Sequence, residues 1–268
     1  MRRYTSLARK AGFKKLFLVL SLDCDTEEDI AVAGEIHFRL VDMGIKPVYA
    51  VPGELLQRGE KVYRHIRDAG GEFINHGYTG HTYFDVAKKR YASCFFYDQL
   101  TREQVRKDII LGDACLKEVL GVAAEGFRAP HFGTFQQPAQ LHFLHSVLCE
   151  LKYQFSTSTV PFFSFRHGPV FEHFGLPEVP VSGRGSRPFA ILDSWACFAA
   201  SDRQLTPEDY ATEGAAAAEL YRDAGVGLLN YYVDPSHIHD QEAFFDTVRL
   251  WRSVAQPVNY HGLFEELL

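Results

Sequence analysis

The chain alternates short apolar runs with longer amphipathic stretches, a pattern typical of parallel β/α proteins. We predict strands from the apolar runs and helices from the stretches in which apolar residues recur every three or four positions. The predicted strands are 16–22, 48–51, 72–75, 126–128, 153–155, 190–193, 227–233 and 258–260. The predicted helices are 27–43, 54–69, 101–120, 138–151, 207–224 and 239–254.

Several helix ends carry recognisable signals. Gly44 and Gly121 follow predicted helices, where glycine is a favoured terminating residue. Thr101 and Gln104 have the spacing of a capping box. Pro207 suits the first turn of its helix. These boundaries give about seven or eight strand–helix units, which we interpret as one α/β domain over residues 1–268.

Two stretches break the alternation. Residues 77–100 are aromatic and irregular, and we expect them to form an active-site loop. Residues 161–188 are rich in proline, glycine and aromatic residues, and we expect a long excursion there rather than a domain boundary.

Composition narrows the class of protein. Hydrophobic residues make up 46% of the 268 positions and charged residues 23%, the balance of a globular protein with a sizeable core. The net charge of −6 gives no reason to expect nucleic acid or an anionic membrane as a partner. No apolar segment approaches the ~20 residues that span a bilayer.

The cysteines and the N-terminus bear on the compartment. The five cysteines are scattered and contain no C-x-x-C pair, so we expect neither a disulfide framework nor a structural zinc site. Basic residues precede the apolar run 16–20, but no cleavage pattern follows it, and we interpret the run as a buried strand rather than a signal peptide. We therefore expect a cytoplasmic protein.

Paired carboxylates follow the first predicted strand. Asp23 and Asp25 are two residues apart, which places them on one side of an extended chain, at the strand end where parallel β/α folds hold their active sites. Two close carboxylates repel each other, so one of them needs a proton or a cation. The alternative is that Asp25 simply caps the following helix.

Two further groups of polar residues follow later strands. His76 and His81 come directly after strand 72–75, and two imidazoles with one carboxylate suit Zn²⁺. Arg128 ends strand 126–128, where its guanidinium can orient a catalytic carboxylate. The alternatives are a chance pair of histidines and a surface arginine at a turn.

Together, Asp23-Cys24-Asp25, His76 with His81, and Arg128-Ala129-Pro130 resemble the first three motifs of the polysaccharide deacetylase family, which is carbohydrate esterase family four with the NodB homology domain. The resemblance covers about residues 16–260 and implies a distorted (β/α)7–8 barrel. It implies Asp23 as catalytic base, Asp25, His76 and His81 as ligands of a divalent metal, most simply Zn²⁺, and Arg128 as the residue that orients the base.

The chain departs from the family pattern at three places. Its two histidines are five residues apart instead of four, which requires a bulge at Gly77 or Gly80. The fourth motif usually has an aspartate where this chain has Phe155 and Ser156. The family's late histidine, its general acid, is replaced by Asp234.

Because of the third departure, the family pattern does not identify which residue is the general acid. A carboxyl serves as an acid only if its pKa rises far above ~3.9. We therefore consider Asp234, His237 and His239 as candidates from the same loop.

The predicted function is metal-dependent hydrolysis of the N-acetyl group of an amino sugar or a sugar precursor, of the kind used for surface polysaccharides. A partner of this type is a small glycan-related molecule. The alternatives are an amidase acting on a small non-peptide C–N bond, and a catalytically impaired sugar-binding relative. Nine aromatic residues are candidates for a sugar-stacking wall, although we expect ordinary packing for most: Tyr78, Tyr83, Phe84, Phe95, Phe96, Phe132, Trp195, Tyr231 and Tyr232.

Overall fold

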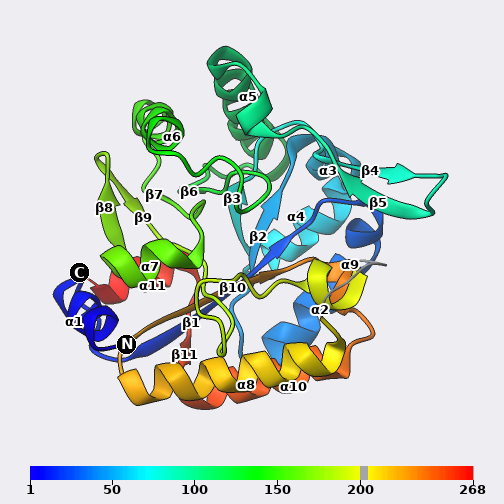
Figure 1. The fold of residues 1–268 in the computed structure, drawn as a ribbon. Helices are drawn as coiled ribbons and strands as arrows, with labels where there is room; N and C mark the ends of the chain where they lie inside the picture. Colours follow the sequence, from blue (N-terminus) through cyan, green and yellow to red (C-terminus); the bar gives the residue numbers. More distant parts are fainter. Residues whose placement is uncertain (200–204, 268) are drawn as a thin grey trace.

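A computed structural model describes residues 1–199 and 205–267 of the chain. Its main sheet has the strand order β10-β1-β2-β3-β6-β7-β9-β8, with β11 paired to β1 (Figure 1). The pairs from β10 through β9 are parallel, and β8 runs antiparallel to β9. A separate two-stranded hairpin, β4–β5, protrudes from the body of the molecule.

The strands are β1 (Leu16–Asp23), β2 (Val48–Val51), β3 (Glu72–Asn75), β4 (Thr82–Asp85), β5 (Arg90–Ser93), β6 (Gly126–Phe127), β7 (Phe155–Ser156), β8 (Phe171–His173), β9 (Leu176–Glu178), β10 (Gly227–Val233) and β11 (Gln256–Pro257). The helices are α1 (Arg2–Lys10), α2 (Glu27–Asp42), α3 (Gly53–Arg58), α4 (Glu60–Asp68), α5 (Arg102–Leu120), α6 (Pro138–Glu150), α7 (Pro161–His167), α8 (Pro207–Ala224), α9 (Pro235–Ile238), α10 (Glu242–Val254) and α11 (Tyr260–Leu267). A 3₁₀ turn, η1, covers Tyr97–Gln99, and a π-helical turn, η2, covers Trp195–Ala199.

Strand β1 lies at the centre of the fold. All eight of its residues are buried, which explains its nearly continuous apolar sequence. It pairs with β10 from Leu16↔Gly227 to Leu22↔Val233 and with β2 from Ser21↔Val48 to Asp23↔Ala50. The carboxyl ends of β10, β1 and β2 therefore meet at one edge of the sheet.

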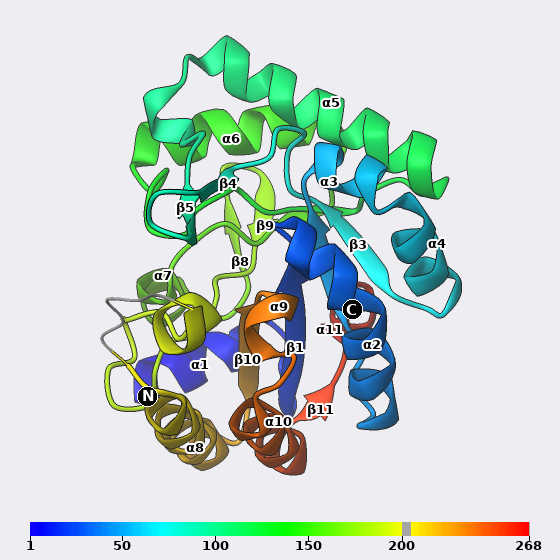
Figure 2. The same ribbon diagram turned by 90° about the vertical axis from the view of Figure 1, so that its right-hand side faces the viewer.

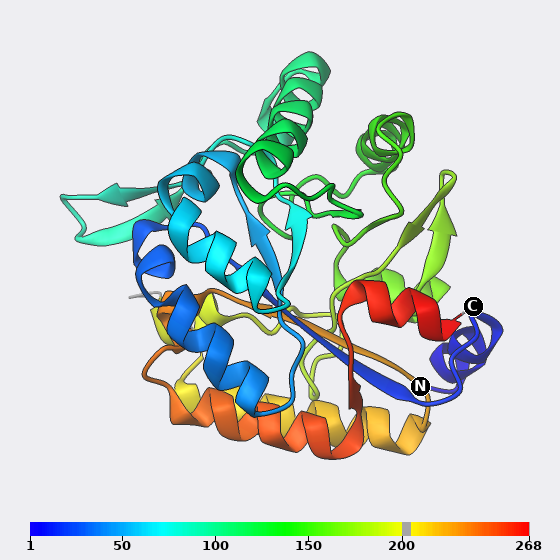
Figure 3. The ribbon, with the colours of Figure 1, turned by 180° about the vertical axis from the view of Figure 1, so that it is seen from behind.

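Helices surround the curled sheet. Figures 2 and 3 show α8 and α10 side by side along one face, with α2 and α4 beside the early strands. Trp251 of α10 is fully buried, stacks on Tyr231 of β10 at 4.1 Å between ring centroids, and donates its indole N–H to the Gly214 carbonyl of α8. This packing holds β10 in place between α8, α10 and the rest of the sheet.

The curled sheet is completed by an extended segment rather than by a regular strand. After β9, Val179 donates its backbone N–H to the Ser156 carbonyl of β7. Three residues later, Ser182 donates its N–H to the Asn230 carbonyl of β10 at 2.7 Å. The segment thus connects the two halves of the sheet, and the predicted α/β fold, a distorted β/α barrel, is confirmed.

Most predicted elements are present, but two predicted strands are wrong. In 190–193 the structure has an isolated bridge, Gly183↔Ile191, and among the described residues no strand pairs with this segment, although Leu192 is buried. In 258–260 the pairing with β1 already lies at 256–257, and Tyr260 begins α11.

Several boundaries also differ from prediction. The helix predicted at 54–69 is divided at Gly59 into α3 and α4, and the helix predicted at 239–254 begins only at Glu242. The stretch 77–100 contains the β4–β5 hairpin and η1, and 161–188 contains α7, β8 and β9, both of which lack a clear period in sequence. Helix α1 was not predicted. Within the described part of the chain, no helix has the length and apolarity needed to cross a membrane.

Candidate active site

Asp23 is the last residue of β1 and Asp25 lies just beyond it. The intervening Cys24 is fully buried, and its N–H donates to the Ala50 carbonyl of β2 at 2.9 Å. This bond keeps the chain extended past the end of the strand. Both aspartates therefore line the same cavity, as the two-residue spacing predicted.

Asp25 does not cap helix α2. The N-cap is Thr26, whose hydroxyl accepts the Asp29 N–H while the Asp29 carboxylate accepts the Thr26 N–H, a complete capping box. The same carboxylate oxygen accepts the Asp25 N–H at 3.0 Å. Asp25 thus keeps its own carboxylate for the site, and the alternative of a capping role is wrong.

The loop after β3 absorbs the five-residue spacing of the histidines. Gly77 has φ +78°, a left-handed conformation that glycine adopts without strain. A Cβ at Gly77 would lie 2.3 Å from Asp108 Oδ2 of α5, so no larger residue fits. The Asp108 carboxylate accepts the backbone N–H groups of Tyr78 at 3.2 Å and Thr79 at 2.9 Å. Helix α5 therefore holds the bulged loop in place.

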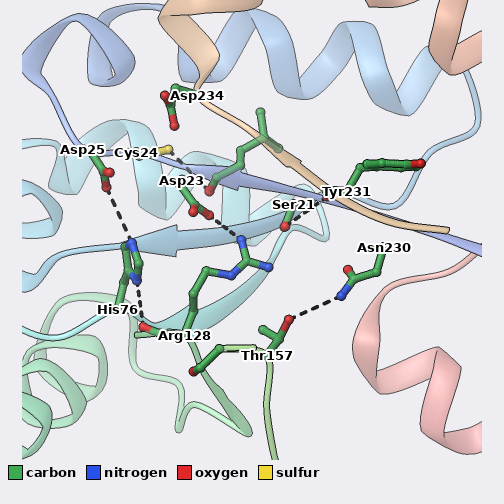
Figure 4. A network of polar contacts seen from close by, with 12 residues as sticks. Ser21, Asp23, Cys24, Asp25, His76, Arg128, Thr157, Asn230, Tyr231 and Asp234 are labelled. Atoms are coloured by element: carbon green, nitrogen blue, oxygen red, sulfur yellow. Dashed lines mark hydrogen bonds and ion pairs between the residues drawn. The ribbon is translucent and has the colours of Figure 1, made fainter. Parts of the chain in front are cut away.

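This loop brings both histidines to Asp25. His81 Nε2 lies 2.9 Å from Asp25 Oδ2, and His76 Nε2 lies 3.7 Å from Asp25 Oδ1. One ligand atom from each of the three residues falls within 4.8 Å of the others. His76 donates its Nδ1–H to the Arg128 carbonyl at 2.8 Å, as Figure 4 shows, which leaves Nε2 with a free lone pair on the side of Asp25.

The electrostatics of this triad suit a positive charge between its members. Burial and the neighbouring His81 lower the pKa of His76 to about 3, so its ring is neutral. Burial raises the pKa of Asp25, but the fields of His81 and His76 outweigh it and lower the pKa to about 2. Burial lowers the pKa of His81, but Asp25 outweighs it and the net pKa is raised. Asp25 is therefore ionised at neutral pH.

Arg128 pairs with Asp23 in the interior. Its Nη1 donates to Asp23 Oδ1, as Figure 4 shows. Its Nη2 donates to the Tyr260 hydroxyl at 3.1 Å. Arg128 is fully buried, so the alternative of a surface arginine is wrong. Burial raises the pKa of Asp23 to about 7 against the lowering effect of Arg128, with Asp25 and Asp234 adding to the rise. A carboxyl with such a pKa accepts a proton readily near neutral pH.

The loop after β10 places Asp234 and His237 together. His237 Nδ1 lies 2.7 Å from Asp234 Oδ2, and Ser194 Oγ lies 3.2 Å from the same nitrogen. Burial lowers the pKa of His237, but the carboxylate of Asp234 outweighs it and the net pKa is raised. His239 instead forms ion pairs with Glu35 and Asp240, away from the cavity.

These side chains surround a cavity of about 300 Å³, the catalytic cavity. Asp23, Asp25, His76, Asp234 and His237 line it, whereas His81 and Arg128 are fully buried behind its wall. Of the nine aromatic candidates, the lining includes Phe96, Phe132, Trp195 and Tyr232. The seven predicted site residues therefore converge on one place.

Sequence reasoning missed three ionisable residues of the described lining, Asp29, His131 and Asp193. Asp29 accepts the Asp25 N–H with Oδ2 and the Ser236 N–H with Oδ1. Its carboxylate therefore links the loop after β1 to the loop after β10. The sequence feature that could have identified Asp29 is its capping-box spacing from Thr26. His131 and Asp193 also line the cavity, from loops with no periodic signal.

Comparison with known proteins identifies solved structures that have a similar fold. No protein-family model matches the sequence, and no curated protein does. Among solved structures, a Mycobacterium smegmatis protein assigned as a polysaccharide deacetylase matches with a TM-score of 0.72 and 18% identity, over 96% of this chain and 91% of that one. A CE4 family pseudoenzyme from Bacillus anthracis matches with a TM-score of 0.55 and 12% identity, over 95% and 66%.

A third match is a peptidoglycan N-acetylglucosamine deacetylase, with a TM-score of 0.56 and 13% identity over 92% of this chain and 86% of that one. The chain therefore has the fold of the CE4 polysaccharide deacetylases. The resemblance stated from the sequence motifs is confirmed at the level of the fold.

Proposed function

We propose that the chain is a metal-dependent hydrolase that removes the N-acetyl group from an amino sugar or a sugar precursor used for surface polysaccharides. The supporting observation is the convergence of Asp25, His76 and His81 beside the Asp23–Arg128 pair. The free cysteines favour a reducing compartment, and we propose the cytoplasm.

The donor set fits a divalent cation. Asp25 Oδ1 is buried without a hydrogen-bond partner, which is costly unless a cation or a proton compensates. One carboxylate and two imidazoles match the three-ligand sets of hydrolytic zinc sites, and His76 has the second hydrogen bond that orients a ligating imidazole. When bound, Zn²⁺ supplies Lewis acidity that polarises a carbonyl and lowers the pKa of water.

The chain's own residues provide the proton transfers. Asp23 takes a proton from the attacking water as the water oxygen bonds to the acetyl carbon. Arg128 holds Asp23 in position. His237, kept protonated by Asp234, gives a proton to the sugar nitrogen as the C–N bond breaks. The products are acetate and the free amine.

Two variants separate the base from the ligand. We expect Asp23→Asn to lower kcat/KM about 10²–10⁴-fold, the usual contribution of a general base, while added zinc still raises the melting temperature. Asp25→Asn loses both turnover and the zinc response. The matched control is Asp246→Asn, which alters an exposed ion pair with Arg249 and leaves both readouts unchanged. Turnover that persists after chelation and in Asp25→Asn would contradict the proposal.

A second candidate is a sugar-binding protein without turnover. Two observations favour it: Asp234 stands where the family has its histidine, and the solved structures of the same fold include a pseudoenzyme. Calorimetric binding of an N-acetylated sugar by zinc-loaded protein, with no acetate released, would support this candidate.

A further inference from the structure

A second cavity of about 330 Å³ adjoins the catalytic cavity. Trp195 and His237 line both, so one ligand can extend from the first into the second. We call the second cavity the hairpin groove, because residues of the β4–β5 hairpin form one of its sides. Its lining comprises Glu28, Phe84, Lys89, Arg90, Tyr91, Trp195, Phe198, Ala199, Ser236, His237 and Gln241.

The described linings of the two cavities differ in their charged residues. The described lining of the catalytic cavity contains five aspartates and neither lysine nor arginine: Asp23, Asp25, Asp29, Asp193 and Asp234. The described lining of the hairpin groove contains Lys89 and Arg90 with one carboxylate, Glu28. Among the described residues, the second cavity therefore offers an anionic group of a substrate more cations for each carboxylate than the first.

Lys89 lines the groove from the turn of the hairpin. Its φ of +51° lies in the left-handed region, which is uncommon for lysine. The neighbouring Lys88 does not line the groove: it is 60% exposed and pairs with Asp85 at 3.1 Å. The two adjacent lysines thus have different surroundings.

Aromatic rings complete the groove. Phe84 and Tyr91 pack edge-to-face at 5.3 Å, and Trp195 packs against the His237 ring at 5.6 Å, both between centroids. Such surfaces suit the apolar face of a sugar or base ring, next to cations that suit phosphate oxygens.

We propose that the hairpin groove binds a phosphate ester carried by the substrate, while the acetamido group occupies the catalytic cavity. The substrate class is then a phosphate-linked N-acetyl amino sugar. The assignment of the acetamido group rests on the proposed function, whereas the phosphate site does not. The phosphate belongs to a sugar monophosphate, a nucleotide diphosphate or a prenyl phosphate, which share this chemistry.

Deacetylation of matched substrates tests the proposal. We expect kcat/KM for N-acetylglucosamine 1-phosphate to exceed that for N-acetylglucosamine about tenfold or more, and Lys89→Asn to remove most of this preference. Asparagine tolerates the left-handed backbone, so the variant changes charge without strain. Lys88→Asn is the matched control and keeps the preference. UDP-N-acetylglucosamine and a short prenyl-phosphate conjugate identify which phosphate is preferred.

Binding of molecules without an amide separates the two proposals. We expect calorimetry to show that glucose 1-phosphate or UDP binds wild-type and Lys88→Asn protein, and that Lys89→Asn binds about tenfold more weakly. If this holds without any deacetylation, the phosphate site stands and the proposed function fails. Equal kcat/KM for phosphorylated and plain sugars, together with binding that ignores Lys89, would overturn the phosphate site.

Discussion

At the scale of single residues, the proposed general acid is where this chain departs furthest from the motif of the deacetylase family. The expected histidine position holds Asp234, yet a histidine three residues later bonds to that carboxylate at the edge of the catalytic cavity. Carboxylate and imidazole together form a dyad in which Asp234 positions His237 and favours its charged form. The dyad therefore offers a protonated donor that neither residue offers alone.

This dyad predicts a change in pH dependence. A general acid must be protonated, so kcat/KM falls as pH rises through the raised pKa of His237. In Asp234→Asn the stabilising charge is lost and burial dominates, so the pKa of His237 drops and the alkaline limb of the pH–rate profile moves to lower pH. Asp240→Asn, which alters the partner of His239 instead, leaves the limb in place. An unmoved limb in Asp234→Asn would exclude His237 as the acid.

At the scale of elements, helix α5 determines whether the histidine loop has a metal-binding geometry. Gly112 of α5 lies so close to the loop that a Cβ there would be 2.6 Å from the Gly77 carbonyl. One turn earlier, Asp108 accepts two loop N–H groups and the Tyr97 hydroxyl at 2.7 Å. The loop conformation thus depends on a helix that begins more than twenty residues after the loop's first histidine.

We predict that Asp108→Asn weakens both the fold and the site. An amide in place of the carboxylate presents a donor to groups that are themselves donors, which costs about 2–3 kcal/mol of unfolding free energy. Urea denaturation measures this loss, and a zinc titration measures the accompanying loss of affinity. Asp113→Asn on the same helix alters an ion pair with Lys117 but keeps a side-chain oxygen that can accept the Tyr153 hydroxyl, and is expected to cost under about 1 kcal/mol. Wild-type zinc affinity in a destabilised Asp108→Asn would show that α5 does not shape the site.

At the scale of the whole molecule, Asn230 joins distant parts of the sheet. It is fully buried in β10, and its side-chain amide donates to the carbonyls of Val179 and Pro180 at 3.2 and 3.0 Å. Its Oδ1 accepts the Tyr260 hydroxyl, which in turn accepts from Arg128. The residue that closes the curled sheet therefore also supports the arginine of the site.

Asn230→Ala is predicted to destabilise the whole fold. It removes the side-chain donor of the Val179 and Pro180 carbonyls and one acceptor of the Tyr260 hydroxyl, at a cost of about 2–4 kcal/mol of unfolding free energy in urea denaturation. The comparison is Asn259→Ala, which removes one bond to the Gly262 N–H and is expected to cost about 1 kcal/mol. Equal losses in the two variants would contradict a closing role for Asn230.

The sequence alone determined the order of most elements and the identity of the first three motifs. Buried parallel strands such as β1 are continuously apolar, and helices such as α5 carry their own capping residues, so both are visible locally. Because β/α folds collect strand ends at one edge, Asp23, His76 and Arg128 could be expected to meet.

Only the tertiary structure decided the conformation of the histidine loop, the pairing of segment 190–193 and the surroundings of the two cavities. Whether a five-residue histidine spacing closes on Asp25 depended on Gly77 and its contact with Asp108, which are far apart in sequence. Whether 190–193 is a strand depended on the absence of a neighbouring strand among the described residues, not on its apolar sequence. The different charged residues of the two cavities come from loops that meet only after folding, and electrostatic fields act through space rather than along the chain.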